Sequence, residues 1–355
     1  MQDNQLKTDR KYMRRCLELA IQAEGFTYPN PLVGSVVMHN GKIIGEGFHQ
    51  KAGNAHAEVN AIDAVKEKSL LSQSVLYVNL EPCAHFGKTP PCALLIKQHK
   101  IPRVVIGCVD TFSQVAGKGI KILRDAGIEV VTGVLEKESR ELNRRFFTFH
   151  EQKRPYVILK WAETRDGFLD IDREVVKDNR PNWITNEHAR RMVHLWRSRE
   201  QSIMVGSITA LKDNPSLTVR DWSGRHPLRV VIDRGNKLPE YLSLFDGTAP
   251  TLWFTGKETN DGRNAENIVL PKDKVPIIEV LDELYKLDIQ SVIIEGGAQL
   301  LNAFIEMGLW DEARVFVGNR WFQRGIKAPR INVVPLMHER FNESDLFVYR
   351  NKILI

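Results

Sequence analysis

The chain has 355 residues, enough for two domains, because a single hydrophobic core usually stops growing at about 250–300 residues. Its net charge of +6 is mild, and the acidic and basic residues are interspersed, which excludes the strongly basic face typical of nucleic-acid-binding proteins. Four cysteines are too few for a disulfide framework, and no apolar run reaches the about 18 residues of a membrane span. The charged N-terminus lacks a signal-peptide core. We therefore expect a cytoplasmic protein that binds neither nucleic acid nor a membrane.

The first half alternates helices with strands. A helical period over residues 9–23 is followed by a hairpin signal at Asn40-Gly41. Next come predicted helices over 58–68, 92–99 and 117–126, and predicted strands over 75–80, 103–108 and 128–132. This order is typical of an α/β domain with a largely parallel sheet. A basic helix over 135–149 then ends before Pro155, so we place the domain boundary between residues 1–150 and 151–355.

The second half alternates in the same way and predicts a second α/β domain. Its predicted helices cover 186–199, 280–287 and 298–307. Its predicted strands cover 156–162, 202–206, 228–233, 251–255, 291–295 and 312–317. The most loop-like stretch is 256–267, which we expect to be a surface connection.

One histidine and two cysteines carry the clearest chemistry in the first half. Glu58 follows His56 by two residues, and Cys83 and Cys92 each follow a proline. One imidazole and two thiolates suit a tetrahedral Zn²⁺ whose fourth position holds a water, and the metal lowers the pKa of that water toward about 7. His-x-Glu followed by Pro-Cys is the zinc-deaminase pattern, in which the glutamate is the general acid/base and not a ligand.

The spacing of the two cysteines departs from that general pattern. Cys92 lies nine positions after Cys83, whereas the general deaminase pattern has only two residues between its cysteines. A structural zinc site is the alternative, but it would use four protein ligands and would leave Glu58 without a role. The three-ligand catalytic site is the favoured interpretation.

Two segments of the second half are less specific. Glu295-Gly296-Gly297 joins an apolar strand to a helix, which suits either an anion site at the helix N-terminus or a tight turn. The segment Gly206–Arg220 gathers small, hydroxyl, acidic and basic residues around an Asn-Pro turn, which suits either a binding segment or an ordinary loop. The residues alone leave both alternatives open.

From about residue 10 to about residue 330, the chain resembles the bifunctional riboflavin-biosynthesis enzymes. The resemblance rests on Asn30-Pro31-x-Val33-Gly34, His56-Ala57-Glu58, the Cys83–Cys92 spacing, Asp166-Gly167 and Trp183-Ile184-Thr185. The wide cysteine spacing is this family's own form. The resemblance implies an N-terminal cytidine-deaminase-like α/β/α domain followed by an α/β reductase domain related to dihydrofolate reductase.

The resemblance also implies the reactions and the partners. A zinc-bound hydroxide would remove the 2-amino group of 2,5-diamino-6-(5-phosphoribosylamino)pyrimidin-4(3H)-one. NADPH would then reduce the ribosyl group of 5-amino-6-(5-phosphoribosylamino)uracil to ribityl. We thus expect a phosphorylated pyrimidine as the small-molecule partner, Zn²⁺ and NADPH as cofactors, and a homo-oligomer.

Site residues carry over position by position. The deaminase substrate is expected to contact Asn30, His49, His85 and Lys88, with Lys88 and the Gly117–Gly119 backbone suited to its phosphate. The reductase substrate is expected to contact Arg197, Leu217, Arg220 and Glu295. NADPH is expected to contact Ala162, Trp183, Thr209, Asp213, Arg234 and Gly297, with Arg234 clasping the 2′-phosphate. Lys160 and Asp213 both remain candidate proton donors.

The chain departs from the family pattern at a few positions. Thr164-Arg165 and Asn214 replace Ser-Leu and an aspartate, Pro181 replaces a serine, and Thr111-Phe112-Ser113 replaces Pro-Asn-Pro. A nucleic-acid or nucleoside deaminase is the alternative function, but it would predict stacking aromatics in a basic groove and would leave the second half unexplained. An inactive deaminase fused to an active reductase is disfavoured because all three ligands and Glu58 are present.

Overall fold

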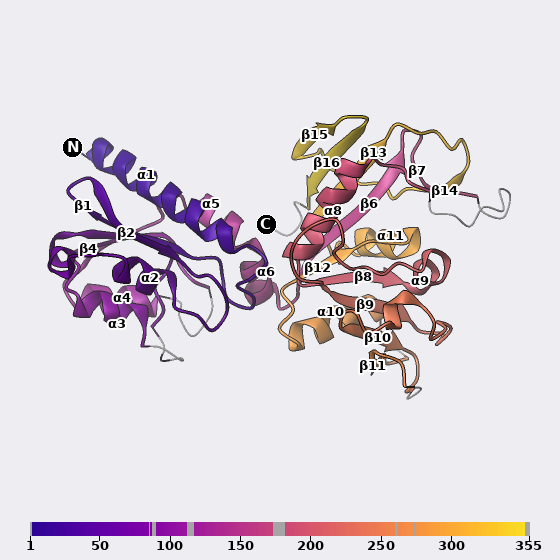
Figure 1. The fold of residues 1–355 in the computed structure, drawn as a ribbon, viewed down its shortest axis with the longest axis horizontal. Coiled ribbons are helices and arrows are strands. Elements are labelled where there is room, and N and C mark those ends of the chain that lie inside the picture. The colour runs from indigo at the N-terminus through magenta and orange to yellow at the C-terminus, as the bar shows by residue number, and fades with distance from the viewer. Residues whose placement is uncertain are drawn as a thin grey trace. The chain divides into compact units, whose positions relative to one another are not determined.

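Two units of mixed helix and strand make up the chain in the computed structural model (Figure 1). Unit 1 is Met1–Lys153 and unit 2 is Arg154–Ile355, against an expected boundary at 150/151. The structure describes residues 2–84, 86, 90–111, 117–172, 182–259, 262–272 and 275–351. Among the helices of these described residues, none is both long enough and apolar enough to cross a membrane.

Unit 1 is built on a five-stranded sheet in the order β2-β1-β3-β4-β5. Its strands are β1 Gly34–His39, β2 Lys42–Phe48, β3 Val75–Leu80, β4 Arg103–Cys108 and β5 Glu129–Thr132. The hairpin at Asn40-Gly41 is confirmed, since β1 and β2 pair antiparallel around it. The prediction of a largely parallel sheet is only partly correct. Strands β3, β4 and β5 are parallel, but β1 is antiparallel to both of its neighbours.

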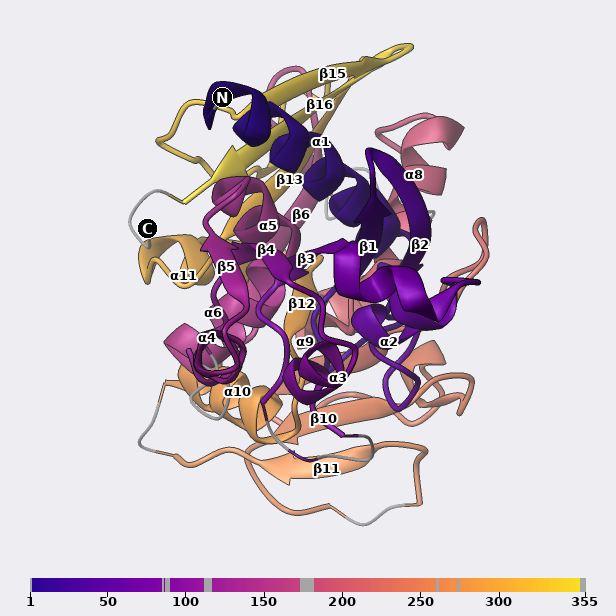
Figure 2. The same cartoon turned by 90° about the vertical axis from the view of Figure 1, so that its left-hand side faces the viewer.

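Helices cover both faces of the unit 1 sheet. Its helices are α1 Gln2–Ala20, α2 Ala57–Asp63, α3 Cys92–Gln98, α4 Lys118–Asp125, α5 Glu136–Leu142 and α6 Arg144–Gln152, with short 3₁₀ turns at Ile21–Ala23 and Lys68–Gln73. Successive strand residues face opposite layers. Val37, Leu76 and Val104 pack under α2, α3 and α4, whereas Val36, Tyr77 and Val105 pack under α1. Figure 2 shows α1 and α5 on one side of the strands and α2, α3 and α4 on the other.

The basic helix expected over 135–149 is two helices in the structure. Asn143 lies between α5 and α6 and has a φ of −99° and a ψ of 20°. Its side chain accepts a hydrogen bond from the Leu32 amide at 2.7 Å and donates one to the Leu32 carbonyl at 2.9 Å. This buried pair of bonds accounts for the break, because it ties the interhelical residue to the segment that leads into β1.

Unit 2 contains a nine-stranded sheet in the order β11-β10-β9-β8-β12-β6-β13-β16-β15. The strands are β6 Tyr156–Thr164, β8 Ser202–Gly206, β9 Leu228–Asp233, β10 Thr251–Thr255, β11 Glu266–Val269, β12 Ser291–Ile294, β13 Glu312–Gly318, β15 Met337–Phe341 and β16 Ser344–Arg350. The pairings from β11 to β13 are parallel, and β16 is antiparallel to both β13 and β15. A separate ribbon pairs β7 Phe168–Ile171 with β14 Gly325–Lys327.

Helices again cover both faces. They are α8 Glu187–Arg199, α9 Ser207–Asp213, α10 Pro276–Lys286 and α11 Ala298–Glu306, with a 3₁₀ turn at Ser243–Phe245. Leu159, Val230 and Ile294 pack against α10 and α11. Ile158, Val231 and Ile293 on the opposite face form a core with Ala210 of α9 and with Leu217. Because β8 and β12 are parallel neighbours, the loops at their carboxyl ends meet at one edge of the sheet. Ligands bind at this edge in open α/β folds.

Candidate functional sites

The three predicted metal ligands come together in unit 1. His56 is the N-cap of α2, Cys92 is the first residue of α3, and Cys83 lies in the turn after β3. Nδ1 of His56 lies 3.5 Å from Sγ of Cys83 and 3.3 Å from Sγ of Cys92, and the three ligand atoms all lie within 4.8 Å of one another. Tetrahedral zinc with ordinary Zn–N and Zn–S bonds would hold such atoms about 3.5–3.8 Å apart, so the donor set fits that metal.

Hydrogen bonds within the cluster favour a thiolate on Cys83. The bond from the Cys92 thiol holds the pKa of Cys83 well below that of an ordinary thiol, a bond from His56 acts in the same direction, and burial opposes both. The Cys92 backbone amide also donates to Cys83 Sγ at 3.2 Å. A sulfur stabilised as a thiolate is the form that ligates a metal.

Glu58 lies in the first turn of α2, close to the ligands. Its side chain is only 3% exposed. Burial, together with the negative charge of Cys83, raises the pKa of Glu58 to about 7. A carboxyl group with a pKa near the working pH can both give and take a proton.

Asn30 and His49 form a second polar pair in unit 1. Nδ2 of Asn30 lies 3.0 Å from Nε2 of His49, whose Nδ1 lies 3.1 Å from the Ala55 carbonyl. The rings of His49 and His56 meet edge to face with their centroids 5.5 Å apart. The two predicted substrate contacts therefore lie beside the metal cluster. His85 and Lys88 lie outside the described residues.

Glu81 has a role that the sequence did not predict. Its carboxylate is 4% exposed and accepts backbone hydrogen bonds of 3.0–3.3 Å from Asp110, Gly117, Gly119 and Ile120. The amides of Gly117 and Gly119, expected to suit a phosphate, are thus already bonded to a carboxylate, so the expectation is wrong for these two amides. A carboxylate at the N-terminus of α4 satisfies its free amides and its positive dipole end.

A cavity of about 1490 Å³ opens in unit 2 at the carboxyl ends of β8 and β12. The predicted contacts Ala162, Trp183, Arg197, Thr209, Asp213, Leu217, Arg220, Glu295 and Gly297 all line it. This cavity exceeds the about 300–1,000 Å³ of pockets that bind one drug-sized ligand, so it has room for a dinucleotide and a small substrate together.

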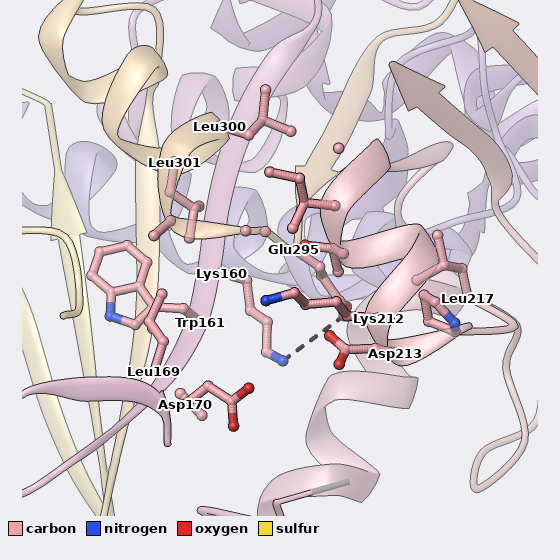
Figure 3. Close-up of a pocket in the computed structure, with 18 of the residues that line it drawn as sticks. Lys160, Trp161, Leu169, Asp170, Lys212, Asp213, Leu217, Glu295, Leu300 and Leu301 are labelled. Carbon is pink, nitrogen blue, oxygen red and sulfur yellow. Dashed lines mark ion pairs between the residues drawn. The ribbon is translucent and has the colours of Figure 1, made fainter. Parts of the chain in front are cut away.

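An ion-pair cluster lies at the base of this cavity. Arg197 on α8 binds Glu295 through two hydrogen bonds of 3.0 and 2.7 Å. Nζ of Lys160 lies 3.9 Å from the same carboxylate (Figure 3). Burial opposes ionisation of Glu295, but Arg197 and Lys160 lower its pKa to about 2. Burial lowers the pKa of Lys160, whereas Glu295 raises it. A partly buried ammonium with a lowered pKa can donate a proton more readily than an exposed lysine.

The segment after α9 is held in an unusual backbone conformation. Asn214 and Leu217 have φ values of 38° and 52°, and Leu217 is buried. Oδ1 of Asn214 accepts from the Ser243 amide at 2.7 Å, and the fully buried Arg229 reaches the Ser216 and Ser243 carbonyls. An aspartate could accept the same bond, and asparagine tolerates this φ well, so the departure at Asn214 preserves the turn.

The remaining expectations for unit 2 have mixed outcomes. Gly297 packs closely against Thr209, because a Cβ at position 297 would lie 2.9 Å from the Thr209 Oγ1. The Thr164 hydroxyl donates to Asp166 at 2.6 Å and accepts from Phe168, so threonine keeps the hydroxyl of the family's serine. Arg234 does not line the cavity; its guanidinium donates to the Lys272 carbonyl at 3.0 Å. Pro181 lies outside the described residues.

Two family models match the chain, one in each half. Residues 6–108 match the cytidine and deoxycytidylate deaminase zinc-binding region, and residues 155–320 match the RibD C-terminal domain. The first match spans the ligand cluster and Glu58. The second spans every residue that lines the cavity except Ile326.

Named relatives match nearly the whole chain. The riboflavin biosynthesis protein RibD of Aquifex aeolicus is 38% identical over 97% of this chain and 95% of its own length. RibD of Bacillus amyloliquefaciens is 42% identical over 86% of this chain and 83% of its own length. A crystal structure of the diaminohydroxyphosphoribosylaminopyrimidine deaminase/5-amino-6-(5-phosphoribosylamino)uracil reductase of Thermotoga maritima is 36% identical, covers 98% of this chain and 99% of its own, and has a TM-score of 0.88.

Proposed function

Because the chain belongs to the RibD family of riboflavin biosynthesis proteins, we propose that its two sites perform that family's two reactions with the residues described above. The chain is a bifunctional enzyme, with a zinc-dependent deaminase domain in its first half and a reductase domain in its second. It deaminates the diaminopyrimidine phosphoribosyl compound and then reduces the ribosyl group of the product to ribityl. The assignments of individual residues and of NADPH are our proposal.

In unit 1, His56, Cys83 and Cys92 would hold the zinc. When bound, zinc supplies a water acidic enough to act as hydroxide near neutral pH. Glu58 would take a proton from that water and return it to the departing amino group, a role that its raised pKa supports. His49 and Asn30 orient the pyrimidine beside Glu58, because their polar atoms lie next to the ligand cluster. Burial of Glu58 keeps bulk water from competing for this proton.

In unit 2, the cavity would bind NADPH and the deaminated substrate side by side. NADPH supplies the hydride when bound. Ala162, Trp183, Thr209, Asp213 and Gly297 line the cofactor side, and the missing side chain of Gly297 leaves room for the Thr209 hydroxyl. Arg197, Leu217, Arg220 and Glu295 line the substrate side. Arg234 does not line this cavity and donates to a backbone carbonyl, so its contact with the 2′-phosphate stays an untested prediction.

Lys160 is the better-supported proton donor in the reduction. It lies within the cavity, its pKa is lowered by burial, and Glu295 fixes its position at 3.9 Å (Figure 3). Asp213, the other candidate, lies on α9 and is exposed.

The convergence of His56, Cys83, Cys92 and Glu58 is the observation that carries the proposal. Purified protein supplied with the diaminopyrimidine substrate is expected to release ammonia and to oxidise NADPH, with NADPH consumption dependent on prior deamination. Cytidine and tRNA serve as controls and are expected to release no ammonia. Ammonia release without NADPH consumption would contradict the reductase assignment.

We propose finally that the enzyme acts as a homo-oligomer in the cytoplasm. The phosphorylated pyrimidine and the nicotinamide cofactor are metabolites of that compartment, which supports the location. Light scattering of the purified chain tests the oligomer: a mass at or near the 40.6 kDa of one chain contradicts it.

A further inference from the structure

A buried histidine of α8 contacts the substrate side of the unit 2 cavity. His194 and Arg197 lie one helical turn apart and so share one face of α8. Nη1 of Arg197 donates to the Thr218 carbonyl at 3.1 Å, and the Arg220 amide donates to Nδ1 of His194 at 3.2 Å. The helix thus binds the segment carrying Arg220 at two alternate backbone positions.

The contact with Arg220 defines the protonation state of His194. A backbone amide can only donate, so Nδ1 of His194 must be an acceptor and the ring proton must lie on Nε2. Nε2 lies 3.5 Å from Oδ2 of Asp221, a suitable acceptor for that proton. The histidine side chain is 6% exposed, which leaves little water to replace a lost contact. His194 therefore accepts the hydrogen bond from the Arg220 amide only in its neutral form.

The surroundings of His194 also favour this neutral form. Arg197 lies on the same helix, Arg220 and Asp221 lie on the segment that packs against it, and Glu295 follows β12. Burial lowers the pKa of His194, and Arg197 and Arg220 lower it further, whereas Asp221 and Glu295 act in the opposite direction. Because both arginines are positive, a proton on His194 would add a third positive charge to the same region.

We propose that His194 is a positioning residue of the reductase, which holds the Arg220 backbone so that its guanidinium stays beside the cavity and binds the anionic end of the substrate. The inference rests on the assignment of Arg220 to the substrate side made under the proposed function. Nothing in the hydride transfer itself passes through His194. Its loss therefore acts on substrate affinity more than on turnover.

The pH dependence follows from the acceptor role. Since the pKa of His194 is lowered, the ring stays neutral above the ordinary histidine value of about 6.5 and the contact is fully present there. As the pH falls through the lowered pKa, Nδ1 gains a hydrogen that faces the Arg220 amide, and the contact is lost. The KM of the reductase is expected to rise on the acidic side only.

Two amide substitutions separate positioning from simple packing. In His194→Asn, the amide oxygen takes about the place of Nδ1, so the acceptor is retained in a group that does not titrate. In His194→Gln, the amide reaches the place of Nε2, so the acceptor at Nδ1 is lost. The full chain is supplied directly with 5-amino-6-(5-phosphoribosylamino)uracil and NADPH, and ammonia release from the diaminopyrimidine measures whether the unit 1 activity is intact.

The expected result is a KM raised about 3- to 10-fold in His194→Gln with kcat nearly unchanged, as for the loss of one hydrogen bond. His194→Asn is expected to keep a KM within about twofold of wild type. Its KM should rise at acidic pH only as far as titration of the substrate phosphate causes, because the asparagine side chain does not titrate. A KM for His194→Gln like that of wild type, or equal defects in both variants, would overturn the proposal. Arg220→Met is the reference: if it leaves KM unchanged, the substrate assignment of Arg220 fails, whatever His194 does.

Discussion

At the scale of single residues, the strongest assignment is Glu58. Replacing it with glutamine keeps the size of the side chain but removes the group that exchanges protons. We expect Glu58→Gln to retain zinc, because Glu58 contributes none of the ligand atoms. Ammonia release should fall by at least about 10²–10⁴-fold. Zinc content and ammonia release measured on the same sample check this. Turnover like that of wild type would refute the acid/base role.

The sequence predicted His56, Glu58, Cys83 and Cys92 because each belongs to a short motif at the end of a predictable element. It could not predict Glu81, whose partners are four backbone amides distributed over residues 110–120. Backbone amides are the same for every residue type except proline, so such contacts leave no pattern in the sequence. The same reason hid His194, since its partner is the amide of Arg220.

At the scale of elements, the N-terminus of α4 packs directly against the turn that carries Cys83. A Cβ on Gly119 would lie 2.0 Å from the Pro82 carbonyl oxygen, so alanine must push α4 away from that turn. We expect Gly119→Ala to weaken zinc binding and to lower the free energy of unfolding by about 1–3 kcal/mol, as overpacking does. Competition with a chromophoric chelator and thermal unfolding measure the two effects.

Gly127, at the other end of α4, supplies the matched control for that substitution. Its φ is +78°, and nothing lies within 4 Å of the place where a Cβ would stand. Gly127→Ala should therefore strain only its own backbone and leave zinc affinity unchanged. Equal loss of zinc affinity in both variants would mean that general destabilisation, and not the contact with Pro82, governs the metal site.

Element prediction succeeded where burial was continuous. The strands at 202–206, 228–233 and 251–255 agree with the structure residue for residue, because their apolar runs are bounded by turn residues. It failed for β15, which is exposed along nearly all of its length, and for the short β7 and β14. It also missed β16, and β11, whose first two residues fall in the stretch 256–267 that was expected to be a loop. An exposed edge strand needs no apolar alternation, so its sequence lacks the signal on which the prediction depends.

At the scale of the whole molecule, alternating helices and strands predicted two α/β domains but not the directions of all their strands. A helix between two strands favours a parallel pair, which holds for β3 with β4 and for β8 with β9. A hairpin reverses the chain, so β1 and β2 are antiparallel. At the other end of the chain, β15 and β16 form an antiparallel pair that the sequence did not predict, and β16 lies antiparallel to β13. The mixed sheets therefore follow from the connections.

The division into two units predicts that the two activities can be lost one at a time. Each unit has its own sheet and its own buried core, so damage to the metal site of unit 1 should leave the cavity of unit 2 intact. We expect Cys83→Ser to lose zinc, because a hydroxyl is a much poorer ligand than a thiolate, and to lose ammonia release with it. NADPH oxidation with 5-amino-6-(5-phosphoribosylamino)uracil supplied directly should stay near the wild-type rate.

Glu58→Gln, which keeps its zinc, is the control that separates loss of metal from loss of deamination. A reductase that fails in Cys83→Ser but not in Glu58→Gln would show that unit 2 depends on the metal-bound form of unit 1, and independent units would then be the wrong description.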